Sequence, residues 1–190
     1  MLSLQLQPHF LFNALNALAE LAHEDREDAR RMLNDLRGLL ALSFERATRA
    51  EVTLSEELEF VGAYVAIQRR RFRGLLVRVQ ADAGALSARV PHLLLQPLVE
   101  NAIRHGLARR GCRVEVRAWR EGDNLRIDVL DDGGGLPRSS GATYGLGLRN
   151  TQARLAFLHG AAQRLELDER PEGGVRARVA LPFRTAESRG

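Results

Sequence analysis

The spacing of apolar residues changes partway along this chain, and that change limits the folds it can adopt. Through about residue 73, apolar side chains recur every three or four positions, which is typical of amphipathic helices. From Leu75 onward, several stretches alternate between apolar and polar residues, which indicates half-buried strands. The pattern predicts an α+β protein in which helices come first and an α/β layer with a mixed, mostly antiparallel sheet follows. We expect the boundary between the two parts near residues 48–54.

The apolar periodicity of the first part predicts an αα-hairpin, that is, two antiparallel helices joined by a short turn around residues 23–28. A polar stripe runs along one face of the first helix: Gln5, His9, Asn13, Asn16, Glu20 and His23. Two apolar rows flank it: Leu4, Leu11, Leu15, Leu18 and Ala22 in one, and Leu6, Phe10, Ala14, Ala17 and Leu21 in the other. A helix that is apolar on two faces needs more than one neighbour. We infer that a second copy completes a dimeric four-helix bundle; the alternative is that the rest of the same chain covers the hairpin.

Cap and turn residues mark the elements that follow. Thr53 and Glu56 predict a capping box at the start of a third helix, and Gly74 is a suitable residue to end it. Pro91 suits the first position of a further helix, which we extend to about Leu107. The other expected elements are strands over residues 75–80, 112–119, 125–129, around 165–167 and 175–181, a helix over residues 147–159, and a turn over residues 171–174.

The charged residues favour a globular protein that does not bind nucleic acid. All of the 28 basic residues are Arg, they are interleaved with 24 acidic residues, and the net charge is +4. The densest basic run, residues 69–73, fits a solvated helix end, where cations interact favourably with the helix dipole. The absence of Lys excludes a P-loop lysine and a Schiff-base lysine. Cys112 is the single cysteine, so an intrachain disulfide cannot form and a cysteine-based zinc site is not expected.

Pro8 and His9 form the first candidate site. Pro8 lacks a backbone N–H and clashes with the preceding turn, so it either kinks the helix just before His9 or marks the start of the regular helix. A kink beside a histidine would favour a functional role, whereas a helix start would leave His9 an ordinary surface residue. The motif by itself leaves both interpretations open.

The second candidate is a polar helix face within residues 100–106. Spacing places Glu100, Asn101, Arg104 and His105 on one continuous face, opposite an apolar one. Such a set of side chains suits a magnesium–polyphosphate ligand, because Mg²⁺ takes hard oxygen ligands and Arg makes bidentate contacts with phosphate. The alternative is an ordinary amphipathic helix with a charged outer face.

Two glycine-rich segments are the remaining candidates. Asp131 ends an alternating strand and precedes Gly133 and Gly135, so its carboxylate can accept a hydrogen bond from an amino group while bare backbone approaches a flat ring. A simple loop turn is the alternative there. Gly145 and Gly147 open a helix, and the backbone amides of a helix N-terminus form a ready anion site. A dinucleotide-binding fingerprint needs a third glycine or alanine that this segment lacks, so we exclude a Rossmann fold.

The order of these motifs carries more information than any one of them. The chain resembles the cytoplasmic kinase core of LytS-like sensor histidine kinases, which act in two-component signalling, and the resemblance extends over nearly its whole length. Residues 7–16 resemble the phosphoacceptor box of that family, residues 64–72 its connecting helix and residues 97–106 its N-box. Asp131-x-Gly133-x-Gly135 and Gly145-x-Gly147-Leu148 resemble the two glycine boxes of the Bergerat-type α/β sandwich, the ATP-binding fold shared with gyrase, Hsp90 and MutL.

The resemblance implies that the ligands are ATP and Mg²⁺. His9 would be the nucleophile that takes the γ-phosphoryl group, and Asn101 would bind Mg²⁺. Asp131 would accept a hydrogen bond from the adenine amino group, and residues 137–144 would form a short lid over ATP. The other residues with an implied nucleotide-binding role are Arg104, His105, Gly133, Gly135, Gly145, Gly147 and Leu148.

Two positions depart from the usual pattern of histidine kinases. Phe10 stands where most of them carry an acidic residue after the phosphoacceptor, a departure that LytS-like members share. The general base is therefore unassigned: Glu100 is one candidate, whereas Asn13 could instead orient His9. Asp132 stands where relatives usually carry Asn, and this second carboxylate could weaken nucleotide binding or add a metal contact.

The resemblance also implies partners and a location. We expect a homodimer in which residues 1–50 form the helical dimerisation and phosphoacceptor region and residues 51–190 the linker helix and ATP-binding domain. A response regulator would receive the phosphoryl group on an Asp in the bacterial cytoplasm, and only a segment upstream of this chain would contact a membrane. Two alternatives stay open: a non-catalytic, nucleotide-binding dimeric scaffold, and an anti-sigma-type serine kinase on the same ATP-binding fold.

Overall fold

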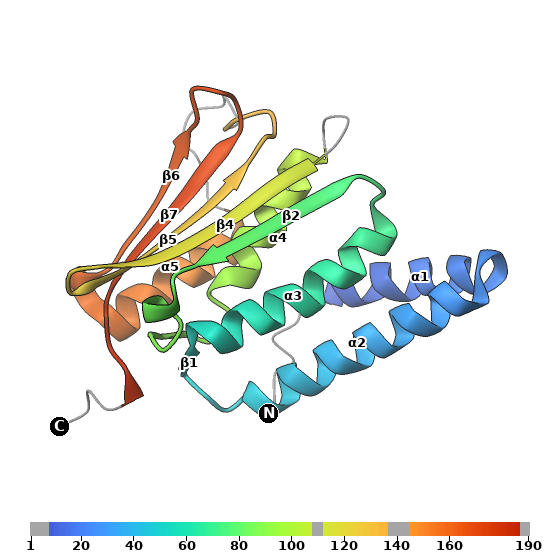
Figure 1. The fold of residues 1–190 in the computed structure, drawn as a ribbon, viewed down its shortest axis with the longest axis horizontal. Helices are drawn as coiled ribbons and strands as arrows, with labels where there is room; N and C mark the ends of the chain where they lie inside the picture. The colour runs from blue at the N-terminus through green and yellow to red at the C-terminus, as the bar shows by residue number, and fades with distance from the viewer. Residues whose placement is uncertain (1–7, 108–111, 137–144, 187–190) are drawn as a thin grey trace.

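The computed structural model describes residues 8–107, 112–136 and 145–186. Helices α1 (Pro8–Glu24) and α2 (Arg26–Arg46) form the hairpin, and β1 (Glu51–Thr53) leads into the long helix α3 (Leu54–Arg71). The remaining elements are β2 (Leu75–Ala81), the 3₁₀ turn η1 (Ala83–Ala85), β3 (Arg89–Pro91), α4 (Leu95–Gly106), β4 (Cys112–Glu121), β5 (Asn124–Asp131), α5 (Leu146–His159), the 3₁₀ turn η2 (Gly160–Ala162), β6 (Arg164–Glu169) and β7 (Val175–Pro182). Figure 1 shows the hairpin and α3 on one side of the molecule and the sheet on the other.

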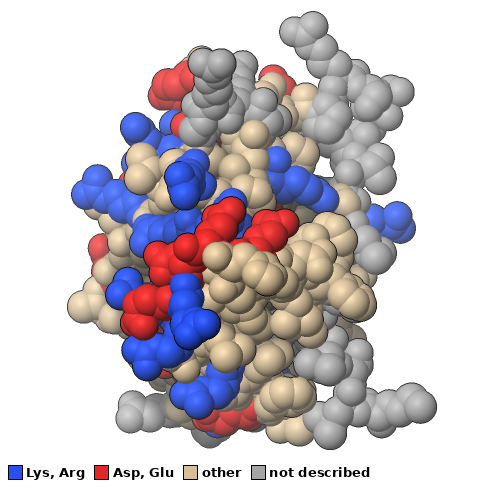
Figure 2. All heavy atoms as spheres, turned by 90° about the vertical axis from the view of Figure 1, so that its right-hand side faces the viewer, with Lys and Arg blue, Asp and Glu red and all other residues tan. Residues whose placement is uncertain are grey.

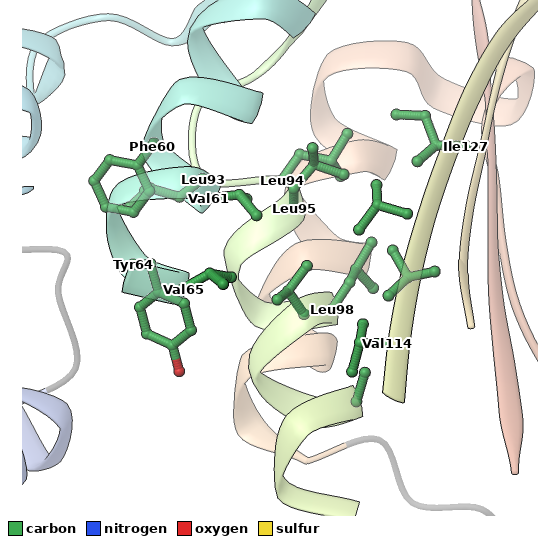
Figure 3. Close-up of a cluster of buried hydrophobic side chains, with 14 of the residues drawn as sticks. Phe60, Val61, Tyr64, Val65, Leu93, Leu94, Leu95, Leu98, Val114 and Ile127 are labelled. Carbon is green, nitrogen blue, oxygen red and sulfur yellow. The ribbon is translucent and has the colours of Figure 1, made fainter. Parts of the chain in front are cut away.

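A five-stranded sheet with the strand order β2-β4-β5-β7-β6 organises the part of the chain that follows α3. β2 pairs with β4 in parallel, and the other neighbouring strands are antiparallel. Val114, Val116 and Ala118 are buried together on one face, as their alternation predicts. α4 lies between this face and α3, with apolar side chains on both sides (Figure 3). The predicted α+β fold with a mixed, mostly antiparallel sheet is confirmed.

The other face of the sheet carries charges of alternating sign. Arg117, Asp128 and Arg178 occupy neighbouring positions on β4, β5 and β7, and Arg178 forms an ion pair of 2.8 Å with Asp168 on β6. Burial raises the pKa of Asp128, and the charges of the surrounding arginines lower it in part. Figure 2 shows a similar mixture of positive and negative side chains at the end of the molecule that it faces. Many of the arginines are therefore held beside carboxylates.

Helix α4 begins at Leu95, so the predicted start at Pro91 is wrong. Pro91 instead ends β3, which pairs with β1; the sequence pattern predicts neither of these short strands. A helix that began at Pro91 would hold Pro97 in its interior, where the missing N–H and the proline ring disrupt helical bonding. A start at Leu95 places Pro97 in the first turn, where its N–H would have no helical partner in any case.

The other predicted elements are found close to their expected positions. The capping box is present, because Thr53 and Glu56 each accept a hydrogen bond from the other's backbone N–H. α3 ends just before Gly74, whose φ of +93° suits glycine. Within the described residues, α1 begins at Pro8. The predicted kink before His9 would involve residues 1–7, which lie outside the described part of the chain.

The hairpin packs against α3 of the same chain. Phe10 is buried, and its ring centroid lies 4.9 Å from that of Tyr64 on α3. Arg70 near the end of α3 pairs with Asp28 and, at 3.2 Å, with Asp35 of α2. The chain itself thus covers the apolar row that contains Phe10 and Ala14, as the alternative interpretation expects.

Other large apolar side chains of the hairpin stay exposed: Phe12, Leu15, Leu33 and Phe44. The same-chain cover is therefore incomplete. Within the described residues, none of the helices combines the length and the apolar character that a membrane crossing needs.

Candidate active site

Helix α4 presents a polar face toward the start of α5. Asn101 Oδ1 accepts a hydrogen bond of 2.8 Å from the Arg104 guanidinium. A Cβ atom added at Gly145 would lie 3.6 Å from the same guanidinium, so the two helices converge there. Glu100 and His105 of the same helix are half-buried. The structure thus brings Arg104 of the predicted N-box close to the second glycine segment.

The start of α5 has the properties of an anion site. Gly145 is its N-cap, and none of the described residues caps the helix with a side chain. The first N–H groups of a helix lack an intrahelical partner and suit an anion. The Thr151 hydroxyl donates to the Gly147 carbonyl oxygen at 3.0 Å, and Leu148 is buried, which holds this first turn in place. The predicted lid, residues 137–144, lies outside the described residues.

Asp131 ends β5, and its side chain is buried. The N–H groups of Gly133 and Val175 both donate to Oδ1, at 2.8 and 3.2 Å. None of the described residues donates to Oδ2, so this oxygen has lone pairs for a further donor, which fits the expected adenine amino group. Burial raises the pKa of Asp131, whereas the two backbone hydrogen bonds and the charge of His105 act to lower it.

Close backbone packing requires glycine around Asp131. A Cβ atom at Gly133 would lie 2.7 Å from the carbonyl oxygen of His105, so the glycine loop rests on the end of α4. Gly135 has a φ of +86° and faces the carboxylate of Glu169. The Leu136 N–H donates to that carboxylate at 3.1 Å. Protein packing alone thus explains Gly133, whether or not a base approaches it.

The turn between β6 and β7 belongs to the site, although the sequence predicts it only as a turn. Gly174 has a φ of +86°, and a Cβ atom there would overlap the carbonyl oxygen of Asp131. Arg170 donates to the same oxygen at 2.7 Å. A cavity of about 490 Å³ lies between this turn and the glycine loop, lined by residues 133–136, Glu169, Arg170, Gly173 and Gly174. In the sequence, the two adjacent glycines of this turn were the signal from which its close packing against Asp131 could have been predicted.

Asp132 has a partner of its own. Its Oδ1 accepts a hydrogen bond of 2.8 Å from the N–H of Arg113, near the start of β4, and the residue is exposed. This contact links the glycine loop to β4.

Glu100 has a buried oxygen, Oε2, to which none of the described residues hydrogen-bonds. Burial raises the pKa of Glu100, whereas the charges of Arg104 and His9 lower it. The pKa of Tyr64 is raised by burial and also by the charge of Glu100. Side chains of α1, α3 and α4 therefore interact around this carboxyl group.

His9 lies in the first turn of α1 and is exposed. The side-chain nitrogen of Asn13 is 3.2 Å from both ring nitrogens, so it can donate to whichever one is unprotonated. The neighbouring residue Phe10 anchors α1 on α3, as described above. This anchor holds His9 on the side of Glu100, and the charge of His9 lowers the pKa of Glu100.

The oxygen atoms of α4 fit the expected Mg²⁺ ion. The described residues contain no cluster of three or more His, Cys, Asp or Glu side chains suited to a metal. A cation on Asn101 Oδ1 would therefore take most of its ligands from water and phosphate, which is the coordination that Mg²⁺ prefers. Glu100, the neighbouring residue in the sequence, has a second hard acceptor in Oε2, which is buried and has no partner among the described residues.

Two family matches together cover most of the chain. Residues 87–185 match the family described as histidine kinase-, DNA gyrase B-, and HSP90-like ATPase, and residues 1–76 match the histidine kinase family. The chain belongs to the histidine kinases and carries an ATPase domain of this type.

Among these, the chain is LytS-like, as its motifs predict. It is 33% identical over 187 residues to the sensor histidine kinase BtsS of Escherichia coli (strain K12). It is 30% identical over 202 residues to the sensor protein LytS of Enterococcus faecalis. The alignments include 97% and 98% of this chain but 33% and 34% of those proteins, so the chain spans about a third of their length.

Solved structures share the fold at lower identity. The catalytic domain of histidine kinase ThkA has a TM-score of 0.57 and 19% identity, and the match covers 71% of this chain and 97% of that one. ThkA in complex with the response regulator protein TrrA has a TM-score of 0.53 and 15% identity, covering 93% of this chain and 59% of that one.

Proposed function

We propose that this chain is the core of a sensor histidine kinase that binds Mg-ATP, autophosphorylates on His9 and passes the phosphoryl group to an Asp of a response regulator. The observation that carries the proposal is the position of α4. Arg104 of this helix, which is hydrogen-bonded to Asn101, lies beside the start of α5, and the charge of His9 acts on Glu100 of the same helix. One helix thus links the nucleotide side of the site to the phosphoacceptor side.

ATP would bind between α4, the glycine loop and α5. Asp131 Oδ2 would accept the adenine amino hydrogen, and the α5 N-terminus with Arg104 and His105 would contact the phosphates. Asn101 Oδ1 would hold Mg²⁺, which supplies positive charge to the phosphates when bound. Gly135, Gly147 and Leu148 would shape the backbone around the ligand.

His9 would attack with the lone pair of a neutral ring nitrogen. An N–P bond forms while the bond from the γ-phosphorus to its bridging oxygen breaks, and ADP leaves with that electron pair. The ring then carries an acidic N–H, and Glu100 accepts its proton. Burial makes Glu100 a stronger base than an exposed carboxylate, because it raises the pKa. Asn13 would orient the ring, and positioning would supply most of the catalysis.

Two kinds of partner follow from this proposal. A response regulator would accept the phosphoryl group; the ThkA–TrrA complex supports a partner of this kind. A second copy would cover the exposed apolar residues of the hairpin, with residues 1–50 as the dimerisation and phosphoacceptor region and residues 51–190 as the linker helix and ATP-binding domain. We place the reaction in the cytoplasm.

Autophosphorylation with γ-labelled ATP and Mg²⁺ tests the proposal. We expect acid-labile, base-stable label on the wild type and none on His9→Gln. His23→Gln is the matched control, because His23 belongs to the same polar stripe of α1, near its other end. It should be labelled like the wild type.

Other results would favour the alternatives. Acid-stable label, or label that persists in His9→Gln, would favour a serine kinase or another acceptor. Bound nucleotide without label would favour a non-catalytic scaffold.

A further inference from the structure

The N-terminus of α4 is capped by a side chain from a different helix. Its own N-cap residue, Leu94, provides no side-chain hydrogen bond, and the first turn contains no acidic residue. Instead, Glu57 of α3 accepts from the Leu93 N–H through Oε1 at 2.6 Å and from the Leu95 N–H through Oε2 at 3.0 Å. The Glu57 side chain is 1% exposed. A carboxylate at this position satisfies amides that lack a helical partner and complements the helix dipole.

The turn that enters α4 is strained, and Glu57 holds it. Leu93 has a φ of +58°, the only positive value for a non-glycine residue within the described ranges. A leucine rarely adopts this conformation, so surrounding contacts must maintain it. The preceding residue, His92, is buried, and its Nδ1 lies 3.4 Å from Glu57 Oε1.

The same turn also contacts α5. Arg154 of α5 donates a hydrogen bond to the carbonyl oxygen of His92. Burial lowers the pKa of Arg154, and the charge of Glu57 acts to raise it, so the two side chains interact. Glu57, His92 and Arg154 therefore join α3, the entry to α4, and α5 in one cluster.

This cluster lies between the hairpin and the helices of the nucleotide site. α3 is tied to α2 by Arg70 with Asp28 and Asp35, and buried Arg46 of α2 donates to the carbonyl oxygen of Glu56, next to Glu57. α4 and α5 carry the proposed contacts with Mg-ATP. We propose that Glu57 is a positioning residue, which fixes α4 and, through the His92 turn, α5 relative to the hairpin. This inference rests on the proposed kinase function.

Glu57→Gln tests the inference, because it preserves the shape but replaces one acceptor with an NH₂ group that would face a backbone N–H. Asp25→Ala is the control: it removes the N-cap of α2, where Asp25 accepts from the Asp28 N–H at 2.9 Å. The KM for Mg-ATP and the kcat of autophosphorylation are measured for the full chain, with urea unfolding in parallel. We expect Glu57→Gln to raise KM at least tenfold and to lower kcat. Asp25→Ala should lose stability but keep the wild-type KM.

The split between KM and kcat separates positioning from simple stabilisation. A variant that is only less stable, but still folded under the assay conditions by the parallel urea curve, keeps the wild-type KM and kcat, because its folded fraction stays near one. A Glu57→Gln protein with the wild-type KM would overturn the inference and leave the kinase proposal intact. A wild type that does not bind Mg-ATP would overturn both.

Arg154→Met keeps the inference testable if Glu57→Gln does not fold. It removes the hydrogen bond to His92 but leaves both Glu57 bonds in place. We expect the KM for Mg-ATP to rise a few-fold. An unchanged KM would overturn the proposed connection from this cluster to α5.

Discussion

Asp131 and Asp132 follow one another in the sequence, yet their surroundings give them different roles. Asp131 is buried, and two backbone N–H groups occupy its Oδ1. Asp132 is exposed and accepts from the Arg113 N–H. Residue type does not distinguish these two carboxylates. Their partners do, and most of those partners come from other strands.

We predict that Asp131→Asn weakens ATP binding by roughly 10- to 150-fold, the equivalent of about 1.5–3 kcal/mol for a hydrogen bond to a charged group. An amide can keep its oxygen toward Gly133 and Val175, but its NH₂ group then faces the adenine amino group, and two donors cannot pair. Calorimetric titration with ATP measures the change.

Asp132→Asn is the matched control for this prediction. The amide oxygen can still accept from Arg113, so we expect ATP affinity within about twofold of the wild type. Equal losses in both variants would mean that general loop distortion, not the adenine contact, explains the effect of Asp131→Asn.

At the scale of elements, α4 shows which features are local. Its polar and apolar faces follow from the helical period, so the sequence predicts them correctly. Its start does not follow from Pro91, because Pro97 and the cap from Glu57 determine where the helix can begin. The cap of α3, in contrast, is predictable from the sequence, because its two residues, Thr53 and Glu56, lie within one turn of each other.

The turn between β6 and β7 gives a prediction at this scale. Gly173 and Gly174 both have positive φ values, +91° and +86°, so Ala at either position costs about 1–2 kcal/mol of conformational strain. At Gly174 a Cβ atom would also overlap Asp131, whereas at Gly173 it meets nothing within 4 Å. We expect Gly174→Ala to lose more stability than Gly173→Ala and, unlike it, to weaken ATP binding.

Urea unfolding and ATP titration of the two variants make the comparison. Gly173→Ala serves as the control for backbone strain. If Gly174→Ala bound ATP as tightly as Gly173→Ala does, the contact between this turn and Asp131 would not matter for the site.

At the scale of the whole molecule, the hairpin has exposed apolar side chains that the described part of the chain does not cover. Leu33 and Phe44 of α2 are 53% and 57% exposed. We predict a dimer through this surface, because a second copy would remove both side chains from water. The double substitution Leu33→Glu and Phe44→Glu should leave the fold intact, since both positions are exposed, but it should give a monomer by light scattering at micromolar concentration.

Phe157→Glu is the control, because Phe157 is 88% exposed but lies on α5, away from the hairpin in sequence. It should stay dimeric. A wild type that is monomeric under the same conditions would contradict the four-helix bundle.

The sequence by itself determined the features that depend on near neighbours: the α+β order, most helices and strands, the capping box, and the residue types of the four candidate motifs. Periodicity and capping act over a few residues, so they can be read along the chain. Only the tertiary structure decided that Glu57 caps α4 from 38 positions away, that Val175 bonds to Asp131 across 44 positions, and that Glu100 has a buried oxygen with no partner among the described residues. Such contacts depend on how whole elements pack, and packing between distant segments has no signature at either residue alone.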